Sequence, residues 1–428
     1  MRSHLSLLAI LLLTAALPAA RAADDLLAFP GAQGAAAHTP GGRGGKILRV
    51  TTLAPGGPGS LLAALEADGP RIVVFEVGGV IDLARREIKI TKPYLTVAGQ
   101  TAPAPGITLT RTGVDVATHD VVLQHIRVRT GSAEAPKRGG WEPDAFSTIG
   151  AHDVIVDHCS MTWAIDENLS ASGPRFTGKT PEDWRRGTSY RVTFSNNIIA
   201  EGLKYSTHSK GEHSKGSLIH DNASDILIVG NLYAHNYERN PLFKGGVRGM
   251  VINNLIYNPG PRAVHYNLIA EEWRGQPYQV GQMTLIGNVL RGGPNTPSGL
   301  ALFMLGGSGD IELYEDDNIA VDWVGRPFEK LGRYTTSSAR IVPMARPSLP
   351  FNVQVLRAAD VQDAVIRTVG ARPWDRDPID ARIVADTIEG RGEIIDDQAQ
   401  VGGYPQYPET RAPFEEGEWD LRYMTKKK

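Results

Sequence analysis

Apolar residues along this chain gather into short segments that are rich in β-branched side chains and are separated by turn-forming residues. From Arg71 onward the segments read RIVVFEV, EIKI, YLTVAG, GITLT, VVLQHIRVR, DVIVDHCS, YRVTFSNNII, DILIVGNLY, GMVINNLIY, QMTLIGNVL and DIELYEDDNI. Their length and composition predict strands, and they lack the 3.6-residue apolar spacing of helices. One open sheet rarely holds so many strands, so we expect an all-β protein with several sheets.

Seven segments carry a polar residue followed by an aliphatic or small one, at what we take to be the same phase. These pairs are His125-Ile126, His158-Cys159, Asn197-Ile198, Asn231-Leu232, Asn254-Leu255, Asn288-Val289 and Asn318-Ile319. Successive pairs lie 33, 39, 34, 23, 34 and 30 residues apart. A strand, a turn, a second strand and a loop of variable length would produce this series, so the pattern predicts stacked coils.

A parallel β-helix fits these coils best. A helical repeat is excluded by the missing helical spacing, and propeller blades would recur about every 40 to 50 residues with signatures of their own. A single asparagine is an ordinary turn former. Asparagines that recur at one turn position would instead hydrogen-bond from coil to coil, as amide ladders do in other stacked sheets.

The pattern divides the chain into four parts. Residues 1–22 read as a signal peptide, 23–70 as a loop region with a capping helix at 60–67, 71–325 as the β-helix, and 326–428 as a C-terminal segment. Ser60 is the expected N-cap of the first helix. In the last part, 358–369 and 378–387 have helical spacing, with Asp377 as the N-cap of the second, and we expect both to pack on the β-helix.

Charge and cysteine usage narrow the class of protein. The 428 residues carry a formal net charge of −2, which argues against binding nucleic acid through bulk electrostatics. The first 22 residues have a basic start, an apolar run and a small-residue end, so we expect a secreted or periplasmic protein without membrane insertion. The single Cys159 forms no internal disulfide. We expect a monomer.

Four acids flank the segment DVIVDHCSMTW. Glu142 and Asp144 precede it in WEPDAF, and Asp166 and Glu167 follow in WAIDENLS. Stacked coils bring strand ends together, so these carboxylates are expected to converge. Crowded carboxylates suit Ca²⁺, which accepts several oxygen ligands in flexible geometry. The EF-hand spacing is missing, and acids in turns also serve as capping residues.

Five basic residues follow the strand VTFSNNII within a short insertion. They are Lys204, His208, Lys210, His213 and Lys215 in LKYSTHSKGEHSKG. Interleaved with small residues, they favour an anion-binding loop over a solvated helix face. They do not favour zinc, because the two histidines lack a third ligand at zinc spacing. We interpret Cys159 as a core residue, since it follows His158 in the chain without nucleophile–base geometry.

The stretch YERNPLFKGG places Arg239 and Lys244 on either side of a proline, directly after an apolar strand. Pro241 disfavours helix for the residue before it, so Arg239 is expected at the end of a strand. Charged loop residues are usually only surface. Together with the acids and the basic loop, however, this stretch suits proton abstraction beside the carboxylate of a uronic acid. A cation would neutralise that carboxylate, basic side chains would stabilise the intermediate, and a base would take the proton.

Several motifs resemble those of pectate lyases of polysaccharide lyase family one. They are AFPGAQG, GGRGGK, GPGSLLAAL, YLTVAGQTAPAPGI, DVIVDHCSMTWAIDEN, IIAEGLKYSTHSKGEHSKG and YERNPLFKGG, spanning residues 29–258. The resemblance implies a right-handed parallel β-helix, secretion, and calcium-assisted β-elimination on polygalacturonate, with this acidic polysaccharide as the partner.

The resemblance also implies roles for individual residues. The calcium ligands would be Asp144 and the acids Asp166 and Glu167, with Glu142 as a further candidate. Arg239 would be the base, with Lys204 and Lys210 as rivals for that role or as substrate-binding cations. The remaining substrate-binding residues would be Lys244, His208, His213 and Lys215.

Two departures and two alternatives stay open. Lys244 stands where the family has a second arginine, which replaces a bidentate fork with a point charge. The insertion 173–187 has no counterpart in the family pattern that we can place. One alternative is a β-helical glycoside hydrolase or a lyase for another uronic-acid polymer, although the acid signatures of a polygalacturonase are missing. The other is a solenoid that binds polysaccharide without cleaving it.

Overall fold

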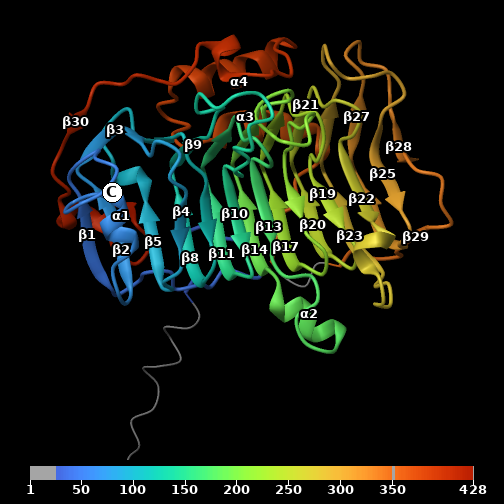
Figure 1. The fold of residues 1–428 in the computed structure, drawn as a ribbon, viewed down its shortest axis with the longest axis horizontal. Coiled ribbons are helices and arrows are strands. Elements are labelled where there is room, and N and C mark those ends of the chain that lie inside the picture. Colours follow the sequence, from blue (N-terminus) through green and yellow to red (C-terminus); the bar gives the residue numbers. More distant parts are fainter. Residues whose placement is uncertain (1–25, 349–351, 428) are drawn as a thin grey trace, which may run out of the picture.

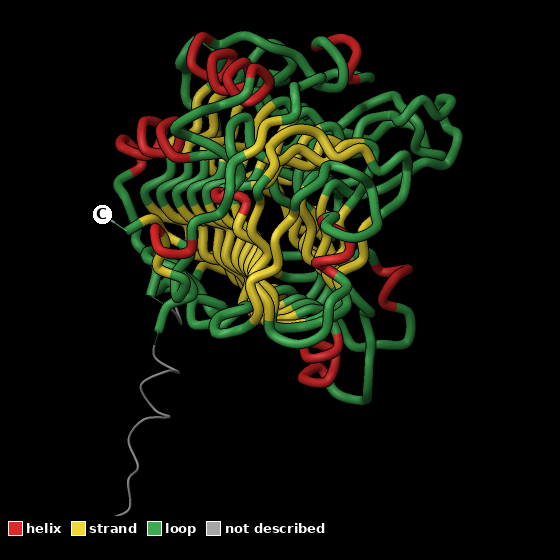
Figure 2. Tube along the Cα trace, turned by 90° about the vertical axis from the view of Figure 1, so that its left-hand side faces the viewer, coloured by secondary structure: helices red, strands yellow, loops and turns green. Residues whose placement is uncertain are grey.

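The computed structural model describes residues 26–348 and 352–427, and the predicted signal peptide lies outside them. The chain folds into the predicted parallel β-helix, in which each coil contributes one strand to each of three sheets (Figure 1). Viewed along the stack, the strands of successive coils superpose (Figure 2). None of the helices within the described residues is long and apolar enough to cross a membrane.

Successive strands pass from the first sheet to the second and then to the third. The first sheet contains β1 (Lys46–Val50), β2 (Arg71–Phe75), β5 (Leu95–Ala98), β8 (His119–Gln124), β11 (His152–Asp157), β14 (Tyr190–Ser195), β17 (Ser224–Val229), β20 (Arg248–Ile252), β23 (Gly281–Ile286), β26 (Ile311–Asp316) and β29 (Ile341–Pro343). The second contains β3 (Val77–Asp82), β6 (Ile107–Thr110), β9 (Ile126–Arg129), β12 (Ser160–Thr162), β15 (Ile198–Ala200), β18 (Leu232–Ala234), β21 (Leu255–Tyr257), β24 (Val289–Arg291), β27 (Ile319–Val321) and, antiparallel to β3, β30 (Thr410–Arg411). The third contains β4 (Ile88–Ile90), β7 (Val114–Val116), β10 (Phe146–Ile149), β13 (Leu169–Ser172), β16 (Leu218–Ile219), β19 (Leu242–Lys244), β22 (Val264–Leu268), β25 (Ala301–Gly307) and β28 (Glu329–Arg333).

Parallel pairing extends past the predicted range 71–325 at both ends. β1 pairs with β2 ahead of it, and β28 and β29 add strands after it. The interior of the coils is one cluster of buried aliphatic and aromatic side chains from all three sheets. Helix α1 (Leu61–Leu65) adds its leucines to this cluster, and the Ser60 side chain accepts a hydrogen bond from Ala63 N as the expected N-cap.

The predicted asparagine ladder is present at the first corner, between the first and second sheets. Its five members are Asn197, Asn231, Asn254, Asn288 and Asn318, all buried. From the second member onward, each side-chain oxygen accepts hydrogen bonds from the backbone N–H and the side-chain amide of the asparagine one coil earlier, at 2.8–3.0 Å. The ladder therefore satisfies buried backbone donors that the corner would otherwise leave unpaired.

The two histidines were assigned to the ladder in the wrong register. Asp157 pairs with Ser195, so Cys159 aligns with Asn197, and His158 aligns with the residue before it. His125 and His158 have φ angles of 59° and 49°, the left-handed conformation that short polar residues and glycine adopt before each ladder position. Cys159 instead ends the ladder: its backbone N–H donates to Asn197 Oδ1 at 2.8 Å, and its side chain is buried in the core, as predicted.

Two helices of the C-terminal segment cover the second sheet, as Figure 1 shows along its upper edge. They are α3 (Ala358–Thr368) and α4 (Pro378–Glu389), and Asp377 caps α4 as predicted. Apolar residues of both helices pack on β15, β18 and β21. The insertion forms α2 (Pro181–Gly187), where Trp184 packs with Trp273 of η2 (Ala270–Trp273). The other short elements are η1 (Gly99–Thr101), η3 (Gln398–Val401), η4 (Glu416–Glu418), β31 (Trp419–Asp420) and β32 (Thr425–Lys426).

Removal of one ladder side chain tests its contribution to stability. Asn231 Oδ1 accepts from Asn197, and its amide donates to Asn254 at 3.0 Å and to the Phe194 carbonyl at 2.9 Å. We expect Asn231→Ala to lower the free energy of unfolding by about 2–4 kcal/mol, because each orphaned buried group costs roughly 1–3 kcal/mol. Chemical denaturation measures this, with exposed Asn352→Ala as the control at under about 0.5 kcal/mol. Equal effects of the two variants would contradict a stabilising ladder.

Candidate active site

The candidate active site lies at the second corner of the β-helix, where loops lead from strands of the second sheet to strands of the third. The loops 130–145, 163–168, 201–217 and 235–241 follow β9, β12, β15 and β18. Neighbouring coils stack these loops, so residues distant in the sequence meet here. Isolated parallel bridges from Glu167 to Lys215 and on to Glu238 continue the stacking through the corner.

Three of the four predicted acids form one cluster. Ligand atoms of Asp144, Asp166 and Glu167 lie within 4.8 Å of one another. The backbone N–H of Glu167 donates to Asp144 Oδ1 at 3.0 Å, which joins the two loops. Glu142 lies beside this cluster rather than in it, since its Oε1 accepts from the Ser209 backbone N–H at 2.7 Å.

Burial disfavours the charged form of the acids at this corner and so shifts their pKa values. Burial, the charge of Asp166 and that of Asp115 raise the pKa of Asp144 well above its ordinary value. Burial raises the pKa of Asp115, on β7, to about 6. Asp166 Oδ1 and Glu167 Oε1 are buried carboxylate oxygens whose neighbours, His213 and Arg239, form no well-aligned hydrogen bond with them. Such oxygens are ligands that a divalent cation would satisfy.

Arg239 faces the acids from the next loop. Its Nη1 contacts Glu167 Oε1 and lies 3.9 Å from Asp166 Oδ1. Its backbone is left-handed, with φ of 63°, directly before the residues that lead into β19. Burial lowers the pKa of the guanidinium, and the charges of Asp166 and Asp144 oppose that effect only in part. The structure thus brings the predicted base to the predicted metal ligands.

The two histidines of the basic loop lie against Asp166. Their rings stack with centroids 3.5 Å apart, and His213 Nε2 is 3.0 Å from Asp166 Oδ1. His208 Nε2 lies 3.6 Å from both Asp166 Oδ2 and Glu142 Oε2. Burial would raise the pKa of Asp166, but the close contact and charge of His213 outweigh it and lower that pKa.

From the sequence, His208 and His213 lacked a third metal ligand. In the structure Asp166 lies where it could supply one. The hydrogen bonds of His208 nevertheless disfavour metal coordination there. Its Nδ1 accepts from the Lys210 backbone N–H at 3.1 Å, so in the neutral ring Nε2 carries the proton. That Nε2–H can donate to the facing carboxylates, whereas a metal would need its lone pair.

The lysines of the same loop differ in their surroundings. Lys204 Nζ lies 4.0 Å from the Tyr237 ring centroid and 3.6 Å from Glu212 Oε2. Lys215 is buried and contacts Glu238. Burial and the charge of Arg262 lower the pKa of Lys215 to about 8. Lys210 is exposed at the surface of the loop.

Lys244 lies away from the acid cluster. Arg239 precedes β19 whereas Lys244 ends it, so the strand separates them. Lys244 Nζ contacts Glu272 and is 3.5 Å from Asp221 Oδ2. Arg175 of the insertion joins the same two acids at 2.9 Å. The structure therefore places Lys244 in a partly buried ion-pair cluster with Arg175 of the insertion.

Comparison with known proteins identifies the family. A probable pectate lyase C of Neosartorya fischeri is 33% identical over 392 residues, covering 90% of this chain and 82% of that protein. The chain belongs to the pectate lyase family. A probable pectate lyase C of Aspergillus terreus is 32% identical over 386 residues, 88% of this chain and 81% of that protein. No family model matches the chain.

Solved structures agree with the fold of this pectate lyase. The cedar pollen allergen Jun a 1 matches with a TM-score of 0.52 and 14% identity, over 79% of this chain and 92% of that one. A mutant of Bacillus subtilis pectate lyase matches with a TM-score of 0.50 and 14% identity, over 79% and 96%. The predicted fold class, family and enzyme class, polysaccharide lyase, are confirmed.

Sequence reasoning missed several groups that contact the predicted residues of this corner. Arg262 contacts Glu238 beside Lys215, and the Tyr237 ring lies under the ammonium of the predicted Lys204. Arg262 follows Arg239 by 23 residues, the same spacing as the shortest coil of the ladder, so the repeat itself could have revealed it. Asp115 carries no such signal, because VDV reads as an ordinary strand alternation.

Proposed function

We propose that this pectate lyase cleaves polygalacturonate by calcium-assisted β-elimination to unsaturated oligogalacturonides, after export from the cell. The observation that carries the proposal is the meeting of Asp144, Asp166 and Glu167 with the half-buried guanidinium of Arg239 at one corner. The expectation of export rests on residues 1–22, whose basic start, apolar run and small-residue end are typical of a signal peptide.

The acid cluster fits calcium better than a transition metal. Its donors are carboxylate oxygens, and two of the buried oxygens lack a well-aligned donor. Hard oxygen donors in irregular arrangement suit Ca²⁺. Asp144, Asp166 and Glu167 would hold it, and bound there it would neutralise the substrate carboxylate and so acidify the neighbouring carbon-bound proton.

We assign Arg239 as the base that removes the proton from the substrate. It takes the proton on carbon five, the electrons of that bond form the double bond between carbons four and five, and the bond from carbon four to the glycosidic oxygen breaks. The departing oxygen takes a proton from water. Burial lowers the pKa of Arg239, so its neutral form is more accessible than that of an exposed arginine, most of all in alkaline solution. Lys204 and Lys210 are the rival bases.

A substrate panel tests the proposed reaction. Pectate, methylated pectin and alginate are incubated with Ca²⁺ or with a chelator, and the ultraviolet absorbance of the unsaturated product is followed. The proposal expects product from pectate with Ca²⁺ and a loss of at least about 100-fold with chelator. Chelator-resistant cleavage without the absorbing product would identify a hydrolase, and calcium-dependent binding without cleavage a non-catalytic solenoid.

Calcium should stabilise the folded protein more at pH 8 than at pH 5. The folded-state pKa of Asp144 and of Asp115 is raised, the latter to about 6, so folding without metal weakens as pH rises from about 4 through these values. At pH 5 a proton on Asp144 competes with the cation. Thermal unfolding with and without Ca²⁺ measures the difference, and Asp166→Ala should abolish most of it. An equal shift in Tm at both pH values would contradict the assignment.

A further inference from the structure

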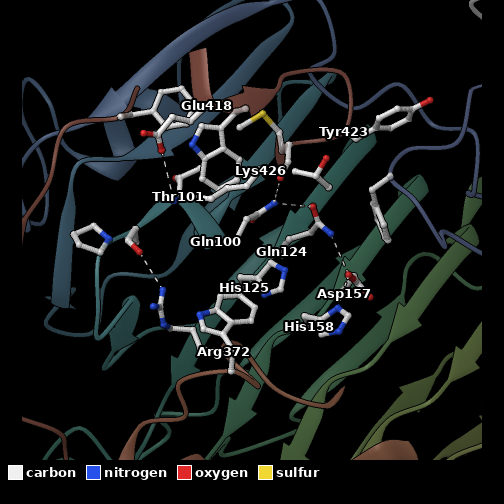
Figure 3. Close-up of a pocket in the computed structure, with 18 of the residues that line it drawn as sticks. Gln100, Thr101, Gln124, His125, Asp157, His158, Arg372, Glu418, Tyr423 and Lys426 are labelled. Atoms are coloured by element: carbon white, nitrogen blue, oxygen red, sulfur yellow. Dashed lines mark hydrogen bonds and ion pairs between the residues drawn. The ribbon is translucent and has the colours of Figure 1, made fainter. Parts of the chain in front are cut away.

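A pocket of about 890 Å³ lies at the first corner of the β-helix, whereas the acids lie at the second. Residues near the ends of β5, β8, β11 and β14 form one wall, and the C-terminal segment 412–426 forms the other. In Figure 3, Glu418, Tyr423 and Lys426 lie on one side of the pocket and His125, His158 and Arg372 on the other. The volume is near the top of the roughly 300–1,000 Å³ range of small-molecule sites.

A hydrogen-bonded row of polar side chains runs between these walls (Figure 3). Gln124 donates to Asp157 Oδ2 at 3.0 Å, and Gln100 donates to the Met424 carbonyl at 3.0 Å. Asp157 is buried, and His158 Nδ1 lies 2.7 Å from its Oδ2. The charges and hydrogen bonds around Asp157 outweigh burial and lower its pKa. This carboxylate therefore stays ionised and holds the polar row in a fixed orientation.

His125 is held in one tautomer. Its Nδ1 lies 2.9 Å from the Ala371 carbonyl oxygen, which can only accept, so Nδ1 carries a proton. Burial and the charge of His158 lower the pKa of His125 to about 4, so the ring is neutral at physiological pH. Nε2 is then an acceptor, and among the described residues it has no hydrogen-bond partner.

Aromatic rings line both walls of the pocket. Trp374 is 57% exposed, and its ring centroid lies 5.1 Å from that of His125. The Arg372 guanidinium covers the Trp374 ring at 5.2 Å. Trp419 and Tyr423 line the opposite wall. An exposed indole offers a flat apolar surface for the C–H face of a sugar ring.

The cations that line the pocket are each paired with an acid, and acids are in excess. Lys426 Nζ lies 3.6 Å from Glu418 Oε2 and Arg372 pairs with Asp375 at 3.1 Å, while Asp157 and Glu415 add two further carboxylates to the lining. No cation is left in surplus among the described lining residues, as recognition of a phosphate or a uronate would need. An apolar ligand would leave the polar row without partners, at a cost for each buried group.

We propose that this pocket binds a neutral oligosaccharide, with one pyranose packed on Trp374 and its hydroxyls hydrogen-bonded to the polar row and His125. Such a ligand matches both the aromatic walls and a lining in which no cation is in surplus. The site is independent of the acid cluster, because it lies at a different corner of the coils. The enzyme would then hold neutral glycan at one corner while the acid cluster meets an acidic chain at the other.

Calorimetry in the presence of a chelator tests this proposal. The probes are the hexasaccharides of β-1,4-linked galactose, glucose and xylose, with hexagalacturonate as the acidic comparison. We expect saturable binding of at least one neutral probe, weakened at least tenfold in Trp374→Ala and partly restored in Trp374→Phe. Trp323→Ala is the matched control, since Trp323 is 64% exposed in the loop after β27.

Turnover of pectate should be unchanged in all three variants, which separates this pocket from the active site. The proposal fails if none of the neutral probes binds, or if their binding survives Trp374→Ala at full strength. It also fails if hexagalacturonate binds in chelator and Trp374→Ala removes that binding, because the pocket would then recognise the acidic chain.

Discussion

Arg239→Lys is expected to lower kcat on polygalacturonate by about 10³-fold and to leave the fold intact. Proton transfer by a positioned side chain typically contributes 10²–10⁴-fold. Lysine keeps a positive charge but loses the planar fork of guanidinium, so the charge next to Asp166 and Glu167 persists while the geometry at the reacting proton changes. Steady-state kinetics on polygalacturonate with saturating Ca²⁺ measure the loss.

The control is Arg248→Lys, because Arg248 is exposed on β20 of the first sheet. It should keep full activity, and both variants should show the thermal unfolding of the parent protein. If Arg239→Lys retains activity while Lys204→Ala or Lys210→Ala loses it, the proton acceptor lies in the basic loop and the assignment to Arg239 is wrong.

Asp380→Ala is expected to reduce the free energy of unfolding by about 3–5 kcal/mol, the usual cost of leaving a buried charge without its partner. Arg129 on β9 donates to Asp380 Oδ1 at 3.0 Å and to Asp377 Oδ2 at 2.7 Å. Arg127 lies 3.4 Å from Asp380 Oδ2, and all four side chains are fully buried. These bonds join the first turn of α4 to the second sheet.

Exposed Asp363→Ala on α3 is the matched control for this loss and should be near neutral. The ion pairs of Asp377 with Arg129 and Arg127 also make the stability of the protein depend on pH. Burial alone would raise the pKa of Asp377, but Arg129 and Arg127 outweigh it and hold that pKa below its ordinary value. The contribution of ionised Asp377 to the free energy of unfolding is therefore complete at pH values above the ordinary pKa of an aspartate. It is lost as the pH falls below that pKa. Denaturation of Asp380→Ala at neutral pH that matches the parent would contradict a stabilising role.

The fold was predictable because stacked coils repeat their signals. Five asparagines at one phase specify the corner and the direction of stacking, and the structure contains their ladder. The register of His125 and His158 was not predictable in the same way. The residue before each ladder position is left-handed too, and in three of the five coils it is polar, namely Asn196, Asn253 and Asp317. Two adjacent polar positions therefore compete for one alignment. The spacing alone does not separate them.

The candidate site was predictable where it depends on strand ends. Asp144, Asp166, Glu167 and Arg239 all lie in loops of the second corner, and stacking alone brings such loops together. Lys244 shows the limit of that reasoning. It stands five residues after Arg239, yet β19 lies between them and directs the lysine to Asp221 and Glu272. Side-chain direction in loops of unequal length depends on contacts that only the folded coils supply.

A crystal structure of Arg239→Lys soaked with Ca²⁺ and hexagalacturonate would show whether the acids and the residue at position 239 act on one sugar. We predict a calcium ion among Asp144, Asp166 and Glu167, a uronate carboxylate on that ion, and residue 239 facing the carbon-five proton of the same sugar. An oligosaccharide bound at another corner, or an ion held without any of these three acids, would contradict this prediction.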